Sequence, residues 1–374
     1  MLLERKIYKD IKQNLFKNKA LILYGPRQVG KTTLIKTIQK EYPNSLYLNC
    51  DEPDIRERLT NTTTTNLILL FEGKKLILID EAQRVENVGL TLKLIVDELR
   101  DVQVIATGSS SFDLSSKIRE PLTGRKIEYM LFPPLVQELS GAYSDIELKR
   151  LLDDMLVFGN YPAIRFSKEV ERREQDLYDL ATSYVYKDIL QIERIKYPER
   201  LEKLLRALAY QVGNEVSYAE LATICSLSRG TVEEYIRILE QAYIIFKLEP
   251  YATNKRNTLK KMRKIYFYDT GIRNAFVRDF RSFAFRNDTG ALFENFFISE
   301  KIKKNATNKS FAQHYFWRSY SGEEIDYLEE DVSGMRGFEC KVKYSGSTIT
   351  KSKNAPLEKC SVVTKETITQ ILND

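Results

Sequence analysis

The first third of the chain alternates between short, continuous apolar runs and segments with helical spacing. Apolar runs of strand length cover residues 21–24, 45–50, 76–79 and 102–106, and an amphipathic pattern over 3–16 predicts a helix ahead of the first strand. A continuous apolar run is typical of a strand that is buried on both faces. Strands of this kind that alternate with helices predict a parallel sheet covered by helices on both sides.

The turn after the first strand matches the pattern GxxxxGK[ST]. Such a turn exposes backbone N–H groups, and the helix after it offers its positive N-terminal end, so that the two form a cradle for phosphates. Lys31 is expected to reach the β- and γ-phosphates, and the Thr32 hydroxyl to hold Mg²⁺. The residues that we predict to bind the nucleotide are Gly25, Pro26, Arg27, Gln28, Val29, Gly30, Lys31, Thr32 and Thr33.

Two of the predicted buried strands end in polar side chains. Asp80 and Glu81 follow one of them, and Thr107 and Ser109 follow the other. The carboxyl ends of parallel strands meet at one edge of a sheet, where ligands bind. Asp80 is expected to help hold Mg²⁺, and Glu81 to polarise the attacking water. Thr107 and Ser109 are both candidates for sensing the γ-phosphate, with ordinary turn chemistry as the alternative.

The composition indicates a folded protein of several domains. A length of 374 residues is too great for one ordinary core, and 43% hydrophobic and 29% charged residues are typical of globular chains. The net charge of +6 permits contact with nucleic acid but does not argue for it. Four dispersed cysteines and one histidine argue against zinc and favour a reduced, cytoplasmic compartment. The apolar runs are too short to span a membrane, and no signal-peptide core is visible.

The middle of the chain is predicted to be helical. Charge-rich helical patterns over 145–158 and 170–195 indicate a lid or connector. Ser217 and Glu220 then form a capping-box pattern, and a second helix over 228–239 follows a short turn. Two helices joined in this way predict a helix-turn-helix.

A basic loop follows between two predicted strands and would form the wing of a winged-helix domain. Its positive residues are Lys255, Arg256, Lys260, Lys261, Arg263 and Lys264. A cluster of this kind favours phosphate binding. The second helix, however, carries Glu233 and Glu234, which repel phosphate. Contact with DNA and a role as a protein-contact or structural module therefore both stay open for this domain.

The last quarter of the chain places acids and a lysine on consecutive elements. Glu294 lies near the start of a predicted helix, Asp326 on a strand, and Glu339 and Lys341 on one face of the next strand. This set predicts a second metal site, where carboxylates hold Mg²⁺ and the lysine helps to activate water. An acid followed by (D/E)xK resembles the restriction-endonuclease-like fold. Because 344–356 gives no clear helix, both an active nuclease and a degenerate copy stay open.

Five stretches resemble, in order, a clade of bacterial and archaeal AAA-type P-loop ATPases that carry a C-terminal domain of unknown function. They read GPRQVGKTTL, LYLNCDEP, LILIDEAQRV, VIATGSSSFDL and LTGRKIEYMLFPPL. The resemblance implies ATP as the nucleotide and an AAA-like core. It also places Arg125 where an arginine follows the sensor strand. That arginine is either a transition-state finger, supplied by a neighbouring subunit, or a partner in an ordinary ion pair.

We predict an α/β chain with four parts. A P-loop NTPase domain with a parallel sheet and flanking helices covers 1–140, and a helical connector covers 141–205. A winged helix covers 206–270, and a small α/β restriction-endonuclease-like domain covers 271–374. The first half is expected to be a Mg²⁺-dependent ATPase whose nucleotide state controls a C-terminal half that contacts DNA or a protein.

Two alternative functions stay open. One is a slow nucleotide-dependent switch that acts through protein–protein contacts. The other is an ATP-gated, metal-dependent nuclease. The expected partners are ATP, DNA or a protein, and further copies of the chain, without a membrane.

Overall fold

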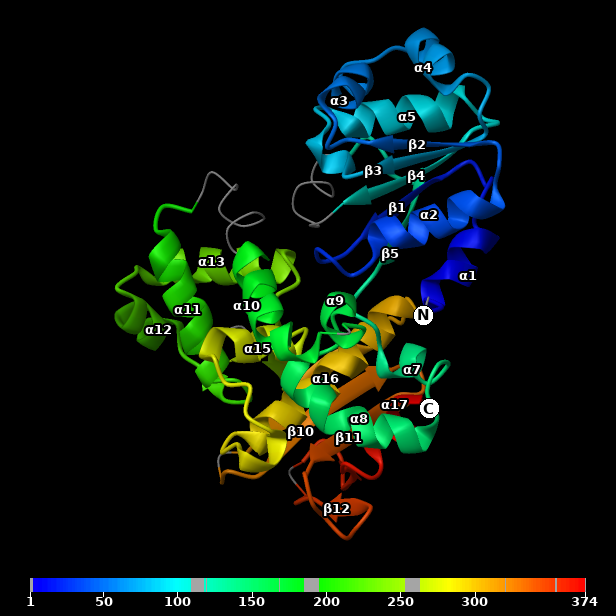
Figure 1. Cartoon of the computed structure of the whole chain (residues 1–374). Coiled ribbons are helices and arrows are strands. Elements are labelled where there is room, and N and C mark those ends of the chain that lie inside the picture. Colours follow the sequence, from blue (N-terminus) through cyan, green and yellow to red (C-terminus); the bar gives the residue numbers. More distant parts are fainter. Residues whose placement is uncertain are drawn as a thin grey trace. The chain divides into compact units, whose positions relative to one another are not determined.

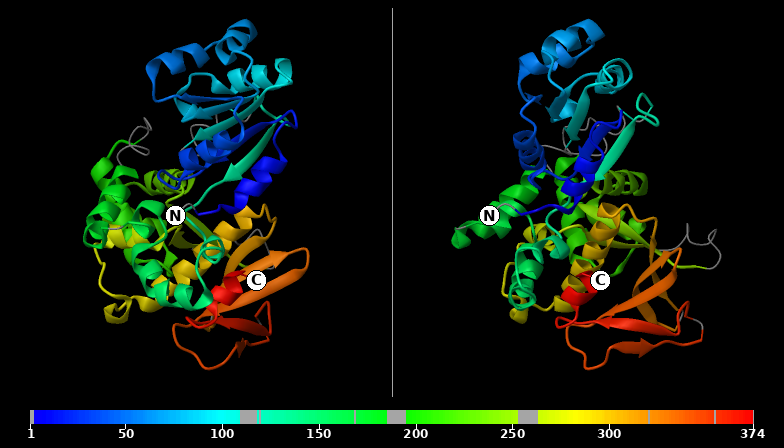
Figure 2. Two further views of the ribbon diagram at one scale, coloured as in Figure 1. Left: turned by 45° about the vertical axis from the view of Figure 1, so that its right-hand side comes forward. Right: turned by 90° about the vertical axis from the view of Figure 1, so that its right-hand side faces the viewer.

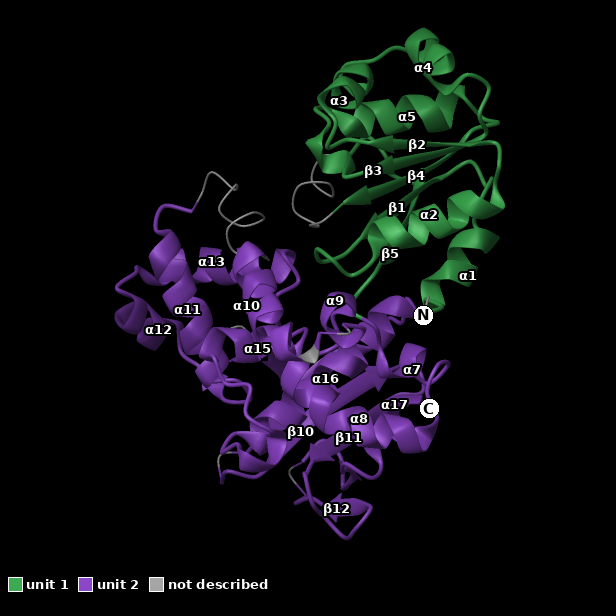
Figure 3. Cartoon of the chain, viewed as in Figure 1, with its two compact units in different colours: residues 1–133 green, residues 134–374 purple. Residues whose placement is uncertain are grey.

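A computed structural model of the chain describes residues 3–373, apart from 109–117, 119, 168, 185–194, 253–262, 320 and 354 (Figure 1). The chain forms two compact units, residues 1–133 and residues 134–374 (Figure 3). The parts expected to follow residue 140 all fall in the second unit, and the division into four domains stays a prediction. Among the described residues, no helix is long and apolar enough to cross a membrane.

The first unit is built on a parallel sheet with the strand order β2-β3-β4-β1-β5. Its strands are β1 (Ala20–Tyr24), β2 (Ser45–Asn49), β3 (Leu76–Asp80), β4 (Gln103–Gly108) and β5 (Lys126–Met130). All neighbouring pairs in this sheet are parallel, which confirms the predicted parallel sheet. Because β4 lies between β1 and β3, the strand before the phosphate-binding turn and the strand before the acidic pair share one neighbour.

Helices cover both faces of this sheet, as the continuous apolar runs predict. The helices of the unit are α1 (Lys6–Gln13), α2 (Lys31–Glu41), α3 (Pro53–Leu59), α4 (Thr64–Phe71) and α5 (Val88–Glu98), with a 3₁₀ turn at Ala82–Arg84. Helices α3, α4 and α5 lie on one face of the sheet (Figure 2), where their apolar side chains pack in its core. Helix α2 contacts β2, β3 and β4. Every residue of β1, β3 and β4 is buried.

The second unit holds a mixed sheet of eight strands in the order β12-β13-β11-β10-β9-β7-β8-β6. Its strands are β6 (Glu215–Val216), β7 (Ile245–Pro250), β8 (Arg263–Phe267), β9 (Gln313–Arg318), β10 (Glu324–Asp331), β11 (Gly334–Cys340), β12 (Thr348–Thr350) and β13 (Lys359–Val363). Strand β7 pairs in parallel with β9. The strands expected for the winged helix and those expected for the nuclease-like domain therefore belong to one sheet.

The helices of the second unit include the predicted helix-turn-helix. They are α7 (Val136–Leu139), α8 (Asp145–Phe158), α9 (Pro162–Arg165), α10 (Arg173–Tyr184), α11 (Pro198–Tyr210), α12 (Tyr218–Cys225), α13 (Arg229–Gln241), α15 (Thr270–Val277), α16 (Thr289–Thr307) and α17 (Ile368–Asn373). The hydroxyls of Ser217 and Ser228 cap α12 and α13 by accepting backbone N–H groups. The two predicted helices are thereby confirmed.

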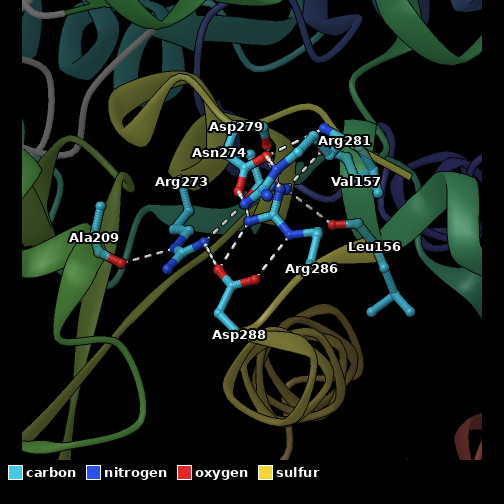
Figure 4. A network of polar contacts seen from close by, with 9 residues as sticks. All are labelled: Leu156, Val157, Ala209, Arg273, Asn274, Asp279, Arg281, Arg286 and Asp288. Carbon is cyan, nitrogen blue, oxygen red and sulfur yellow. Dashed lines mark hydrogen bonds and ion pairs between the residues drawn. The ribbon is translucent and has the colours of Figure 1, made fainter. Parts of the chain in front are cut away.

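A network of buried arginines and partly exposed aspartates ties the helices of the second unit together (Figure 4). The side chains of Arg273 and Arg286 are 3% and 0% exposed, and both pair with Asp288 at the start of α16. Arg273 also donates to the backbone oxygen of Ala209 in α11. Asn274 donates to two backbone oxygens of α8. Four helices (α8, α11, α15 and α16) thus meet through one set of charged and polar groups.

The single histidine of the chain gives a direct test of burial in this unit. His314 Nδ1 lies 2.8 Å from the hydroxyl of Tyr327. Burial lowers the pKa of the imidazole below its usual 6.5, although the negative charge of Glu329 acts to raise it. The unfolded chain therefore binds this proton more readily, so the contribution of His314 to stability is complete above pH 6.5 and falls as the pH drops towards the folded pKa. We expect one imidazole titration by ¹H NMR, with a midpoint below 6.5. A midpoint at or above this value would contradict the buried environment.

Candidate functional site

The phosphate-binding loop leaves β1 through a position that requires glycine. A Cβ atom on Gly25 would lie 2.1 Å from the carbonyl oxygen of Leu131, and the φ of Gly25 is +155°. Gly30, with a φ of +99°, ends the loop and precedes the first residue of α2. The two glycines fix the path of the loop from the strand to the helix. The nine predicted nucleotide-binding residues thus lie between the end of β1 and the first turn of α2.

Lys31, the first residue of α2, is buried and folds back over the loop. Its Nζ donates to the backbone oxygens of Gly25 at 2.8 Å and Pro26 at 2.7 Å. Arg5 supports the same loop, because its guanidinium donates to the backbone oxygen of Val29 at 2.9 Å. The sequence gives no signal for the role of Arg5. A lysine in the position of Lys31 carries the charge that P-loop enzymes direct at the β- and γ-phosphates.

Asp80, at the carboxyl end of β3, accepts hydrogen bonds from hydroxyl groups of three other elements. Its Oδ2 accepts from the Thr32 hydroxyl of α2 at 2.7 Å and from the Tyr47 phenol of β2 at 2.7 Å. Its Oδ1 accepts from the Thr107 hydroxyl of β4. These bonds fix the orientation of the carboxylate beside the first turn of α2. A hydroxyl and a carboxylate are oxygen ligands that Mg²⁺ prefers, so Thr32 and Asp80 fit this ion.

Glu81 is linked to Asp80 through Thr107. The backbone N–H of Glu81 donates to the Thr107 hydroxyl at 3.1 Å, and its carboxylate accepts from the Gln83 amide at 2.5 Å. Its φ of +54° turns the chain directly after β3. The structure thus brings Asp80, Glu81 and Thr107 together at the carboxyl edge of the sheet. Ser109, the other predicted sensor, lies outside the described residues.

Tyr47 is a member of this site that the sequence reasoning missed. Burial raises the pKa of its phenol, and the hydrogen bond to Asp80 and its negative charge raise it further. The phenol therefore remains a hydrogen-bond donor at neutral pH. The sequence places Tyr47 in the predicted strand over 45–50, near the edge of the sheet where the other site residues lie. Its contact with Asp80 depends on the pairing of β2 with β3, which the sequence does not reveal.

Removal of the Tyr47 hydroxyl is expected to weaken Mg²⁺ binding, because the Asp80 carboxylate loses one of the hydrogen bonds that fix its orientation. In Tyr47→Phe, the Mg²⁺ concentration that supports half-maximal ATP hydrolysis should rise by about fivefold, since one hydrogen bond is worth about 1 kcal/mol. Binding of ATP in EDTA should stay unchanged, because the ring and its packing are retained. Tyr42→Phe, at the end of α2, is the matched control. An unaltered Mg²⁺ dependence would show that Tyr47 does not position Asp80.

Arg125 does not join this site within its own chain. It directly precedes β5, and its backbone oxygen accepts from the N–H of Ala20, the first residue of β1. Because β1 and β5 are parallel, Arg125 lies at the opposite edge of the sheet from the phosphate-binding loop. Its guanidinium is paired with Asp97 at 2.6 Å. Of the two predicted roles, the ion pair is therefore present in this chain, and a role towards a neighbouring subunit stays a prediction.

The described part of the predicted basic wing is paired with acids. Arg263 forms an ion pair with Glu249 at 2.8 Å. Lys264 does not lie on the predicted basic wing, because its side chain is buried. It is paired with Glu294 at 3.1 Å and with Glu324. Burial alone would lower the pKa of Lys264, but these two carboxylates raise it above its ordinary value. Lys264 therefore belongs to the C-terminal acid site and does not add to a basic surface. The wing residues Lys255, Arg256, Lys260 and Lys261 lie outside the described residues.

The predicted C-terminal residues lie near one another, but they do not converge on one point. Glu294, Asp326 and Lys341 help to line a pocket of about 410 Å³, whereas Glu339 does not line it. Burial, together with the charges of Glu294 and Glu339, raises the pKa of Asp326 to about 8. Burial also raises the pKa of Glu294.

We tested whether these acids fit the metal that a nuclease-like fold implies. Among the described residues, no group of three or more His, Cys, Asp or Glu side chains is arranged to hold a metal ion. Asp326 Oδ2 accepts the backbone N–H of Cys340 at 2.7 Å, and Glu294 and Glu339 are paired with lysines. The donor set of Glu294, Asp326 and Glu339 therefore does not fit the predicted second metal site.

Comparisons with known proteins give family models and relatives for most of the chain. Three family models match the chain: an AAA domain over residues 17–140, a domain of unknown function (DUF8612) over 149–282, and another (DUF4143) over 289–371. An uncharacterized protein of Mycobacterium tuberculosis is 27% identical over 363 residues, which cover 96% of this chain and 78% of that protein. An uncharacterized protein of Methanocaldococcus jannaschii is 25% identical over 346 residues, which cover 86% of this chain and 74% of that protein.

Among solved structures, a Walker-type ATPase of Pyrococcus abyssi has the same fold. It matches with a TM-score of 0.51 and 14% sequence identity, over 74% of this chain and 96% of that one. The parallel sheet, the phosphate-binding loop and the match over residues 17–140 identify an AAA-type P-loop ATPase domain in the first part of the chain. In the same chain, a domain of unknown function is matched at 289–371. The predicted resemblance is thereby confirmed.

Proposed function

We propose that the chain binds ATP with Mg²⁺ at the Gly25–Thr33 loop and that the nucleotide state controls the C-terminal half. The observation that carries the proposal is the bonding of Asp80 to both Thr32 and Thr107, which joins the loop to the acidic strand end. Thr32 and Asp80 would hold Mg²⁺, which supplies positive charge to the phosphates. Lys31 adds a second positive charge, and Glu81 orients the attacking water. Thr107 is the candidate sensor of the γ-phosphate.

Replacement of Lys31 tests the nucleotide site. Lys31→Ala is expected to lower ATP turnover by at least about a hundredfold, because the charge that stabilises the transferred phosphoryl group is lost. Phosphate release measures turnover, and a fluorescent ATP analogue measures binding. Lys40→Ala, on an exposed position of the same helix, is the control and should retain full activity. Full hydrolysis by a folded Lys31→Ala chain would refute the proposed site.

The partner of the C-terminal half is proposed to be DNA or a protein. The second helix of the helix-turn-helix favours a protein partner, because Arg229 is paired with Glu233 and Arg237 with Glu234. Positive charges in such pairs are less available to DNA phosphates. ATPase rates with and without single- and double-stranded DNA separate the two cases. Stimulation that falls steeply with salt would favour DNA, and unchanged rates would favour the protein switch.

The setting that we propose for this activity is the cytoplasm. All four cysteines are buried and free of disulfide bonds, as expected in a reducing compartment.

A neighbouring copy of the chain is the proposed source of a transition-state arginine, with Arg125 as the candidate. Mixing Arg125→Ala chains with Lys31→Ala chains tests this, because each would supply what the other lacks. Activity that is regained on mixing would support the shared site.

A further inference from the structure

We infer that two lysines of the chain itself, Lys264 and Lys351, pair with acids of the C-terminal site and close it to divalent metal ions. Neither lysine belongs to the ExK pattern of Glu339 and Lys341. Lys264 is in β8, and Lys351 directly follows β12. The second unit would then not act as a metal-dependent nuclease. This inference does not depend on the partner proposed above.

Both carboxylate oxygens of Glu339 are occupied by ammonium groups. Lys341 Nζ lies 3.3 Å from Oε2, and Lys351 Nζ is paired with Oε1. Lys351 also donates to the backbone oxygen of Glu324 at 2.5 Å, so its ammonium is fixed between β10 and β11. The side chains of Lys351 and Glu339 are 7% and 4% exposed. This pair is therefore shielded from water and from exchange with dissolved cations.

Lys264 pairs with a second acid of the site, Glu294. Its Nζ lies 3.1 Å from Glu294 Oε1, and it is also paired with Glu324. The same oxygen of Glu294 accepts from the phenol of Tyr266 at 2.5 Å. The Lys264 side chain is 3% exposed. Glu294 thus has a cationic and a neutral donor, both supplied by β8.

These contacts direct the three acids towards different partners. Mg²⁺ requires oxygen ligands that converge in near-octahedral geometry. Here Glu339 faces Lys341 and Lys351, Glu294 faces Lys264, and Asp326 accepts a backbone N–H group. A divalent cation among them would have to break shielded ion pairs and would lie close to ammonium groups of like charge. The lysines already pair with the carboxylates of Glu294 and Glu339 that a metal would need as ligands.

Mn²⁺ binding to the nucleotide-free, full-length chain tests the inference. The Asp80→Asn chain removes the acid ligand proposed for the ATP site, and a second chain carries both Asp80→Asn and Asp326→Asn. Free Mn²⁺ is measured by electron paramagnetic resonance. We expect the two binding curves to superimpose. A bound Mn²⁺ that disappears on the change of Asp326 would overturn the inference.

A lysine variant tests whether the ammonium group is what excludes the metal. In the Asp80→Asn chain, Lys351→Met is expected to tighten Mn²⁺ binding by about tenfold or more, because a nearby like charge is removed. That gain should vanish when Asp326→Asn is added. Lys353→Met, an exposed lysine of the same segment, should give no gain. A folded Lys351→Met chain without any gain would overturn the inference, and if this variant does not fold, the comparison at Asp326 decides.

Discussion

Replacement of Glu81 with glutamine is expected to lower the turnover of ATP by about 10²–10⁴-fold while ATP still binds. The amide keeps the size of the side chain and can still contact the Gln83 amide, but it cannot accept a proton or polarise water as a carboxylate does. The loop, Lys31 and Thr32 are untouched by this change. The loss should therefore appear in kcat and not in the affinity for ATP.

Steady-state phosphate release and equilibrium binding of a fluorescent ATP analogue separate the two effects. Glu86→Gln is the matched control, because Glu86 is an exposed carboxylate in the same segment. It should retain the turnover of the parent chain. Undiminished hydrolysis by a folded Glu81→Gln chain would show that another group orients the water. Loss of ATP binding would instead show that Glu81 supports the loop.

The sequence predicted most of the first unit because its signals are local. Strands that are buried on both faces must be apolar throughout, and this produces runs that are visible without knowledge of the fold. The phosphate-binding loop is also one continuous segment, so the motif contains the whole cradle. Asp80 and Thr107 could be placed together because parallel strands end at a common edge. Their hydrogen bond bears out that reasoning.

Other members of the site depend on strand order, which no local pattern contains. Tyr47 reaches Asp80 only because β2 pairs with β3 in the register that sets Asn49 opposite Asp80. Arg125 follows the sensor strand in the sequence, yet it precedes β5 and so lies at the opposite edge from the loop. Closeness along the chain was a poor guide to closeness in the fold for this arginine.

The C-terminal acids show the same limit in a different form. The sequence correctly placed Asp326 and Glu339 on consecutive strands, which pair in the structure. It could not supply their counter-ions, since Lys264 lies in a strand assigned to the wing and Lys351 in a segment without a helical pattern. Lys264 reaches the acids because β7 pairs with β9 and joins β8 to their sheet. Lys351 reaches them because β12 pairs with β13, which in turn pairs with β11. Long-range pairing thus decides what the acids bind.

Truncation of Asp288 to alanine is expected to destabilise the second unit by about 3–5 kcal/mol, because it leaves two buried guanidinium groups without their shared carboxylate. Arg286 bonds both oxygens of Asp288, and Arg273 pairs with one of them. Urea unfolding of the full chain measures the loss as a lower midpoint. The control is Glu169→Ala, which removes an exposed ion pair with Arg172 and should cost less than about 1 kcal/mol.

Acid titration of the same variant tests the electrostatic origin of this effect. Burial alone would raise the pKa of Asp288, but the hydrogen bonds and charges of Arg286 and Arg273 hold it below its ordinary 3.8. A depressed pKa means that the carboxylate stabilises the folded state above pH 3.8 and that this contribution is lost as the pH falls through the folded pKa. Between pH 5 and 3, the unfolding midpoint of Asp288→Ala should therefore fall less steeply than that of the parent chain. Equal slopes would mean that packing, and not charge, holds α15 and α16 together.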